Sequence, residues 1–219
     1  MQFLKENKNL FYIAFALPIF FFYFDSAFIL WMRDFQQNNP NNYLLLEFVD
    51  HLFDIISHGL TLIIIACMFY ITGSFFHKRF YKDVGKSLII SFLSAGIVAQ
   101  ILKHLIGRAR PRLTDNLVFI GPTLKSGYDS FPSGHTTVGF CFAYILSQYF
   151  PRYRAIFYIF AVIVGFERAE DYSHFLSDVF AGAVIGLILG KLLLKMFRSK
   201  QLALMSEITP QSSYRNNNQ

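Results

Sequence analysis

Three short polar stretches interrupt an otherwise apolar sequence, and their residue types suit chemistry on phosphate. They cover residues 103–111, 131–136 and 168–178. Together they hold histidines, carboxylates and cations that stay protonated at neutral pH. Binding a phosphate ester requires such cations, and cleaving it requires a nucleophile and a proton donor.

The cations and one helix start predict a phosphate-binding site. Lys103, Arg110 and Arg168 are positively charged, and the planar arginine head group matches two phosphate oxygens at once. Ser133 and Gly134 precede an expected helix, where free backbone N–H groups and the helix dipole favour an anion. The Ser133 hydroxyl could instead serve as an ordinary N-cap. These groups alone would bind phosphate without cleaving it.

Two histidines and an aspartate could supply the cleavage. His174 and Asp178 are four residues apart in the sequence, so on a helix they share one face. Asp178 could then accept a hydrogen bond from one ring nitrogen and leave the other free to attack phosphorus. His135 heads another helix and could protonate the departing oxygen. The cations would stabilise the charge of the transition state.

The composition indicates the solvent around these groups. Hydrophobic residues make up 54% of the 219 residues, charged residues 16%, and Phe alone contributes 27. The mean hydropathy is +0.39. These values are typical of a helical membrane protein with several spans. They argue against a disordered chain, a small disulfide scaffold and a water-soluble enzyme.

Six apolar segments predict an all-α fold, a bundle of six transmembrane helices. The segments cover about 9–31, 52–76, 85–107, 134–150, 154–171 and 174–197. A span needs about 20 residues. The third and fifth segments are short, but flanking charges can reach the interface and the sixth segment needs a return path. We expect one domain over residues 1–200 and a disordered, Ser/Asn/Gln-rich tail over 201–219.

Charge predicts the orientation of the bundle. Six spans place both termini on one side, and the positive-inside rule makes that side cytoplasmic. The net charge of +6 then reflects topology, and no nucleic-acid partner is expected. In this arrangement all three polar stretches meet at the outer membrane surface.

Six basic residues fall on the outer side, against the rule, which makes them candidates for function. They are Lys103, Arg108, Arg110, Arg112, Lys125 and Arg168. Arg108, Arg112 and Lys125 could contact an anionic lipid headgroup or could be ordinary solvated loop residues. The sequence has no P-loop and no Cys/His spacing typical of a metal site, so neither a metal nor a cofactor is expected.

The three stretches together resemble the signature of the type 2 phosphatidic acid phosphatase family. That signature reads Lys-x6-Arg-Pro, then Pro-Ser-Gly-His, then Ser-Arg-x5-His-x3-Asp. Residues 103–111, 132–135 and 168–178 match it in order and spacing. Glu167 stands where the family usually has Ser, a departure that concerns phosphate contacts at that position and not the reaction.

The resemblance implies a metal-independent lipid phosphatase that acts through a phosphohistidine. His174 would be the nucleophile, Asp178 its orienting partner and His135 the general acid. The implied phosphate-binding residues are Lys103, Arg110, Ser133, Gly134 and Arg168.

The implied partners are a membrane lipid phosphate and the bilayer, with no obligate protein partner. The family includes phosphatases of phosphatidic acid, phosphatidylglycerophosphate, undecaprenyl diphosphate and lipid A. Compact size and short loops look bacterial, which implies the cytoplasmic (inner) membrane with the site on the periplasmic or extracellular side. Residues 107–111 and 174–179 are similar to stretches of lipid A phosphatases.

Other functions remain open from the sequence. A phosphotransferase would share the first half-reaction and pass the phosphoryl group to another lipid. A transporter of anionic lipids would use the cations without the His174/Asp178 pair, and no inverted repeat favours it. A vanadium haloperoxidase would use a similar anion site, but known members of that branch are soluble.

Overall fold

The computed structural model describes residues 19–39, 51, 55 and 59–208. Their regular elements are all helices, so the predicted all-α class is confirmed. In chain order these are α3 (Asp25–Asn38), α5 (Gly59–Phe75), α6 (Arg79–Ile106), α7 (Gly134–Tyr149), the short 3-10 helix η1 (Pro151–Tyr153), α8 (Arg154–Glu170) and α9 (Leu176–Ile208). Within the described ranges, extended pairing is limited to one bridge, between Arg108 and Phe119.

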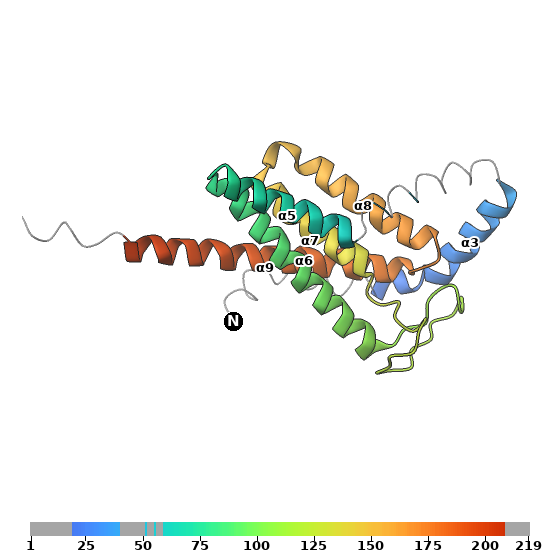
Figure 1. Cartoon of the computed structure of the whole chain (residues 1–219). Helices are drawn as coiled ribbons and strands as arrows, with labels where there is room; N and C mark the ends of the chain where they lie inside the picture. The colour runs from blue at the N-terminus through green and yellow to red at the C-terminus, as the bar shows by residue number, and fades with distance from the viewer. Residues whose placement is uncertain (1–18, 40–50, 52–54, 56–58, 209–219) are drawn as a thin grey trace, which may run out of the picture.

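Helix α7 lies at the centre of the bundle. It packs against α6, α8 and α9, and α5 packs along α6 (Figure 1). The core between these helices includes Leu88 of α6, Cys141 and Ile145 of α7, and Leu194 of α9. Helix α9 approaches α7 closely because Gly186 has no side chain: a Cβ there would lie 2.3 Å from the Thr137 backbone oxygen. The start of α7 and the start of α9 are thereby held side by side.

Among the described residues, two helices are long and apolar enough to cross a membrane, by length and composition. They are α6, with 28 residues, and residues Leu176–Phe197 of α9; α5 is a shorter apolar helix. One face of α6 carries Ile90, Leu93, Ile97 and Ile101, with exposed fractions between 41% and 59%. An exposed apolar stripe at this spacing suits contact with lipid tails. The six-span topology and the location of the termini stay predictions.

The helix boundaries agree with the apolar segments at 134–150 and 154–171 and differ elsewhere. Helix α9 continues to Ile208, into the expected tail, of which residues 209–219 lie outside the described ranges. Residues 9–18 of the first segment and most of 52–58 also lie outside them. Helix α3 continues past the expected end at residue 31 to Asn38. It does so because its polar residues bind the loops around the site: Arg33 donates to Asp115 at 2.8 Å.

Candidate active site

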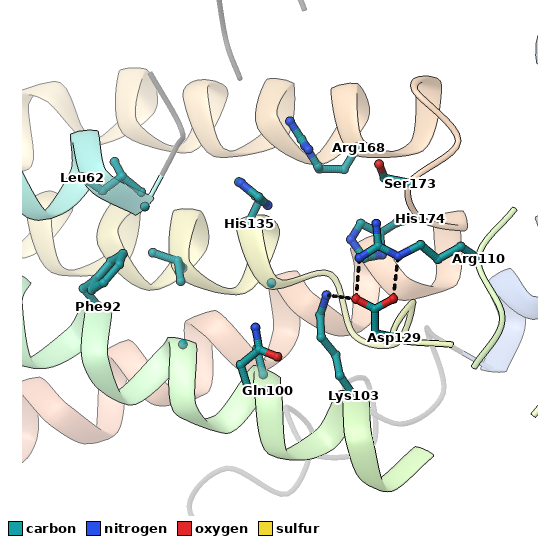
Figure 2. A pocket seen from close by; sticks show the side chains of 15 residues that line it. Leu62, Phe92, Gln100, Lys103, Arg110, Asp129, His135, Arg168, Ser173 and His174 are labelled. Carbon is teal, nitrogen blue, oxygen red and sulfur yellow. Dashed lines mark hydrogen bonds and ion pairs between the residues drawn. The ribbon is translucent and has the colours of Figure 1, made fainter. Parts of the chain in front are cut away.

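A cavity of about 420 Å³ lies among α5, α6, α7 and α8, beside the loop that leads into α9 (Figure 2). All three polar stretches contribute to its wall. Of the residues singled out in the sequence, six line it: Lys103, Arg110, Gly134, His135, Arg168 and His174. Ser133 and Asp178 are fully buried beside it. The structure therefore brings together groups spread over 76 positions of the chain, from residue 103 to residue 178.

The end of α6 places the first two cations. Lys103 lies in its last turn and is only 6% exposed. The helix stops at Gly107, whose φ of 60° is left-handed and whose N–H bonds the Lys103 carbonyl. A Cβ at Gly107 would lie 1.9 Å from the Gly121 oxygen, so only glycine fits this turn. The turn allows the chain to bring Arg110 back to the cavity beside Lys103.

Asp129 binds both of these cations. Its Oδ1 and Oδ2 accept hydrogen bonds from Nε and Nη2 of Arg110 at 2.9 Å and 2.6 Å, and its Oδ2 lies 4.0 Å from Nζ of Lys103 (Figure 2). Partial burial alone would raise the pKa of Asp129, but the hydrogen bonds and charge of Arg110 outweigh it and hold the pKa below its usual value. At neutral pH the ionised carboxylate of Asp129 is therefore bound to Arg110 and Lys103, the two cations expected to bind phosphate.

Arg168 is held by its neighbour. Its Nε and Nη2 donate to Oε2 and Oε1 of Glu167 at 2.5 Å and 2.6 Å, and its Nη1 lies 3.9 Å from Oδ2 of Asp171. The Glu167 side chain is 4% exposed, and that of Arg168 is 11% exposed. The residue that departs from the family signature thus fixes the Arg168 head group at the cavity wall.

His174 lies in the loop before α9 and is 2% exposed. Its Nδ1 faces Oδ2 of Asp178 at 3.8 Å, which is too long for a hydrogen bond, and Nδ1 has no hydrogen-bond partner among the described residues. Burial lowers the pKa of His174, and the neighbouring Asp178 carboxylate opposes this only in part. The imidazole is therefore neutral at neutral pH, the form that a nucleophile needs.

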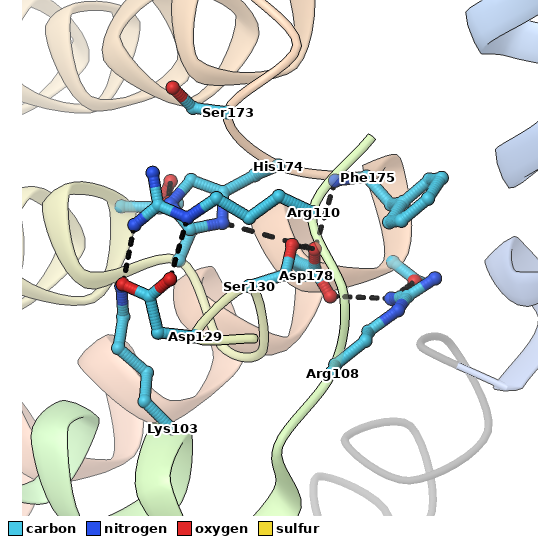
Figure 3. Close-up of polar contacts among 12 residues, drawn as sticks. Lys103, Arg108, Arg110, Asp129, Ser130, Ser173, His174, Phe175 and Asp178 are labelled. Carbon is cyan, nitrogen blue, oxygen red and sulfur yellow. Dashed lines mark hydrogen bonds and ion pairs between the residues drawn. The ribbon is translucent and has the colours of Figure 1, made fainter. Parts of the chain in front are cut away.

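Asp178 is fixed at the start of α9. Its Oδ2 accepts from the Ser130 hydroxyl at 2.5 Å and from the Phe175 backbone N–H at 2.9 Å. Its Oδ1 accepts from Nη1 of Arg108 at 2.5 Å (Figure 3). Phe175 directly precedes α9, and Asp178 is the third residue of that helix. A side chain at the third position caps the helix start when it accepts a hydrogen bond from the backbone N–H of the residue that precedes the helix, as Asp178 does here. The carboxylate therefore has one fixed orientation, toward His174.

The start of α7 places the second histidine. Ser133 is the N-cap of the helix by position, but its side chain makes no capping bond; its hydroxyl accepts from Thr136 Oγ1 at 2.8 Å. The backbone N–H of Ser133 donates to the Asp178 carbonyl at 3.1 Å. Gly134 and His135 line the cavity, and Figure 2 shows the His135 side chain pointing into it.

The three residues considered for headgroup contact lie in different surroundings. Arg108 is fully buried and bound to the carboxylates of Asp25 and Asp178, a placement that contradicts contact with a headgroup. Arg112 is exposed and pairs with Asp171 at 3.0 Å. Lys125 is exposed as well, with its Nζ 4.8 Å from the Tyr128 ring centroid.

Three contributors were missed in the sequence: Asp25, Asp129 and Ser130. The sequence contained a signal that could have identified Asp25, because a carboxylate inside an apolar segment of about 23 residues is rarely without a function. Asp129 and Ser130 directly precede the second stretch, but nothing in their spacing distinguishes them from ordinary loop residues.

Comparisons with known proteins agree with this geometry. Residues 84–202, more than half of the chain, match the model of the PAP2 superfamily. The chain is 40% identical over 107 residues to a lipid A 1-phosphatase of Rhizobium etli, covering 47% of this chain and 46% of that protein. It is 30% identical over 145 residues to phosphatidylglycerophosphatase B of Bacillus subtilis, covering 58% and 67%.

A solved structure is similar as well. The crystal structure of Aquifex aeolicus LpxE superposes with a TM-score of 0.56 at 28% identity, covering 74% of this chain and 93% of that one. The chain covers less than half the length of the lipid A 1-phosphatases it matches. The family match, together with the cavity on which the three polar stretches converge, shows that this chain belongs to the PAP2 superfamily.

Proposed function

We propose that this chain is an integral membrane lipid phosphatase that hydrolyses a phosphomonoester or diphosphate of a lipid. The observation that carries the proposal is the buried His174 beside the fixed carboxylate of Asp178, in a cavity with three cations. The relatives that match the chain are named as lipid phosphatases, which supports the same reaction.

The reaction proceeds in two steps. Since Nδ1 of His174 faces Asp178, its Nε2 attacks phosphorus, a P–N bond forms, and the bond from phosphorus to the lipid oxygen breaks. His135 gives its proton to that oxygen. His135 then takes a proton from a water molecule, which attacks the phosphohistidine, releases inorganic phosphate and restores His174.

The remaining residues stabilise charge. Lys103, Arg110 and Arg168 hold the phosphate oxygens, together with the backbone around Ser133 and Gly134 at the start of α7. Asp178 stabilises the positive charge that develops on His174 during attack. Asp129 gives up Arg110, or shares it, when phosphate enters the cavity.

The substrate lies at the extracytoplasmic surface of a bacterial cytoplasmic membrane in this proposal. Lipid A, undecaprenyl diphosphate, phosphatidylglycerophosphate and phosphatidic acid are the candidates. The similarity to lipid A 1-phosphatases favours lipid A as the first to examine.

The test is phosphate release by the detergent-purified chain from these four lipids in the presence of EDTA. His174→Asn should abolish release. His77→Asn is the matched control, because His77 is exposed between α5 and α6, at the opposite end of α6 from Lys103, and Asn tolerates its φ of 53°. Release that persists in His174→Asn would refute the mechanism. If no lipid releases phosphate, transfer to a labelled acceptor lipid would identify a phosphotransferase instead.

A further inference from the structure

A buried arginine links helix α3 to the carboxylate behind His174. Asp25, the first residue of α3, and Arg108 are both fully buried. Nη2 of Arg108 lies 2.7 Å from Oδ2 of Asp25. Its Nη1 lies 2.5 Å from Oδ1 of Asp178 (Figure 3). One guanidinium therefore bridges two carboxylates that are far apart in the sequence.

Asp25 also holds the start of α9. Its Oδ1 accepts from the Ser177 backbone N–H at 2.9 Å, and its Oδ2 accepts from the Ser177 hydroxyl at 2.5 Å. The same hydroxyl accepts from Nη1 of Arg108 at 2.6 Å. The Asp25 carboxylate accepts hydrogen bonds from Arg108 and from the backbone and hydroxyl of Ser177, all of them donors, which suits its ionised form. Asp25, Arg108, Ser177 and Asp178 form what we term the Asp25 network.

Aromatic rings enclose this network. The Arg108 guanidinium carbon lies 4.2 Å from the Phe175 ring centroid, 4.9 Å from that of Phe22 and 5.5 Å from that of Phe119. The rings contribute cation–π attraction and keep water away from the charges. In so dry a site, charges act on one another more strongly than they would in water.

The charges of the network do not balance. When both carboxylates are ionised, as their hydrogen-bond donors favour, they share one guanidinium, which leaves one net negative charge beside His174. Because Asp25 and Asp178 share the positive charge of Arg108, the guanidinium neutralises Asp178 less than it would if it bound Asp178 alone. More negative charge therefore remains near His174. This excess is balanced when His174 becomes positive during attack on phosphorus.

We infer that Asp25 is a positioning residue for the nucleophile: through Arg108 and the start of α9 it sets the orientation of Asp178 and the charge around His174. The inference rests on the proposed function for its role in turnover. Asp25 lies outside residues 84–202, the part of the chain that matches the family model. The residues that position His174 therefore extend beyond that part.

The first test needs no substrate. The charged and titratable groups around His174 are Asp178 from α9, Lys103 from α6, His135 from α7, Arg168 from α8, and Arg110 with its partner Asp129 from the loop after α6. Asp25→Asn alters none of them but removes one negative charge. We expect the pKa of His174 to fall in this variant, as read from NMR titration of isotope-labelled histidine in detergent.

Asp34→Asn is the matched control for this titration. It makes the same chemical change on the same helix, at an exposed residue that receives a hydrogen bond from Asn38. The His174 signal is identified by its absence in His174→Asn. An unchanged pKa of His174 in Asp25→Asn would overturn the inference.

The second test separates positioning from simple anchoring of α3. In single turnovers with enzyme in excess over the lipid, the amplitude reports the active fraction and the rate constant reports the chemistry. Asp25→Asn should lower the rate constant by about tenfold, the lower end of the loss known for outer-shell partners at metal sites, at wild-type amplitude. A loss confined to the amplitude would show a structural anchor and refute the inference.

A second variant covers the case in which Asp25→Asn does not fold. Ser177→Ala keeps both carboxylates but removes the hydroxyl that receives Arg108 and donates to Asp25, so Arg108 should turn further toward Asp178. Ser177→Ala should lower both the pKa of His174 and the rate constant, as Asp25→Asn does, but by a smaller amount. The two proposals fail separately: a wild type that hydrolyses no lipid refutes the proposed function, whereas the histidine titration still decides the role of Asp25.

Discussion

Asp129 binds Arg110 through two hydrogen bonds, of 2.9 Å and 2.6 Å, inside the cavity where Arg110 is proposed to hold phosphate. A planar carboxylate on a guanidinium mimics two oxygens of a phosphate group. The cavity therefore contains an internal competitor for its ligand. The consequence is a weaker hold on the phosphate product than the cations alone would give.

Asp129→Asn should strengthen inhibition by inorganic phosphate. The amide keeps the shape of the side chain but loses the charge that competes for Arg110 and Lys103. Because the pair is partly exposed, we expect a gain of about threefold in affinity, within the range of such ion pairs. The measurement is the inhibition constant of phosphate in the lipid hydrolysis assay.

Asp115→Asn is the control for this change. It removes another partly exposed ion pair of the loop after α6, with Arg33, away from the cavity. Weaker inhibition by phosphate in Asp129→Asn would mean that Asp129 aims Arg110 at phosphate and does not compete with it.

The lowered pKa of Asp129 predicts a pH dependence of stability. A carboxyl group whose pKa is depressed in the folded state stabilises the fold above its unfolded pKa of about 3.9. That contribution is lost as the pH falls through the folded value. Wild type should therefore have a slightly higher Tm than Asp129→Asn at neutral pH, and the difference should shrink as the pH falls below about 4. A difference that grows toward acid would contradict the assigned direction.

The sequence allowed the residues that line the cavity to be predicted better than the residues that hold them in place. The spacing of Lys103, Arg110, His135 and His174 was sufficient because each lies at or beside a helix end that the apolar pattern places. Arg108 was not predictable in the same way. The direction in which the Arg108 side chain points depends on Asp25, which is 83 residues away in the sequence. The local pattern of apolar residues does not reveal such a contact.

The apolar pattern also misjudged some helix ends. It locates where a chain can meet lipid, so it placed α7 and α8 within a residue of their observed ends. The pattern did not predict that α3 continues past residue 31, because Arg33 and Gln36 are polar. Those residues are held by Asp115 and Glu170 from distant segments. Contacts between segments decide such boundaries.

Glu167→Gln tests the departure from the family signature. The change removes the carboxylate charge that binds Nε and Nη2 of Arg168 in a nearly buried pair, and weakening a buried ion pair in this way destabilises a protein. We expect a lower Tm for the variant than for wild type. A bound anion should then replace the missing carboxylate, so orthovanadate should raise the Tm of Glu167→Gln more than that of wild type.

Glu170→Gln is the control for this thermal shift. Glu170 is equally buried on α8 but binds Gln36. It should lower the Tm without enlarging the effect of vanadate. An equal vanadate effect in wild type and Glu167→Gln would show that the anion does not take the place of the Glu167 carboxylate on Arg168.

The contact between α7 and α9 should be intolerant of even one methyl group. Gly186→Ala would place a Cβ 2.3 Å from the Thr137 oxygen and 3.0 Å from the Cys141 nitrogen, both backbone atoms that cannot move aside alone. We expect a loss of about 1–3 kcal/mol, as for other overpacked cores, seen as a lower Tm. Gly96→Ala is the control, because a Cβ there meets nothing within 4 Å, and alanine favours the helix.

Activity should fall in Gly186→Ala beyond the loss of folded protein. Pushing α9 from α7 lengthens the bond from the Ser133 N–H to the Asp178 carbonyl, now 3.1 Å, which joins the two helix starts. That movement separates His135 on α7 from His174 beside α9. The measurement is the single-turnover rate constant at a temperature where the variant is folded. An unchanged rate constant would show that the two helix starts hold their positions independently of Gly186.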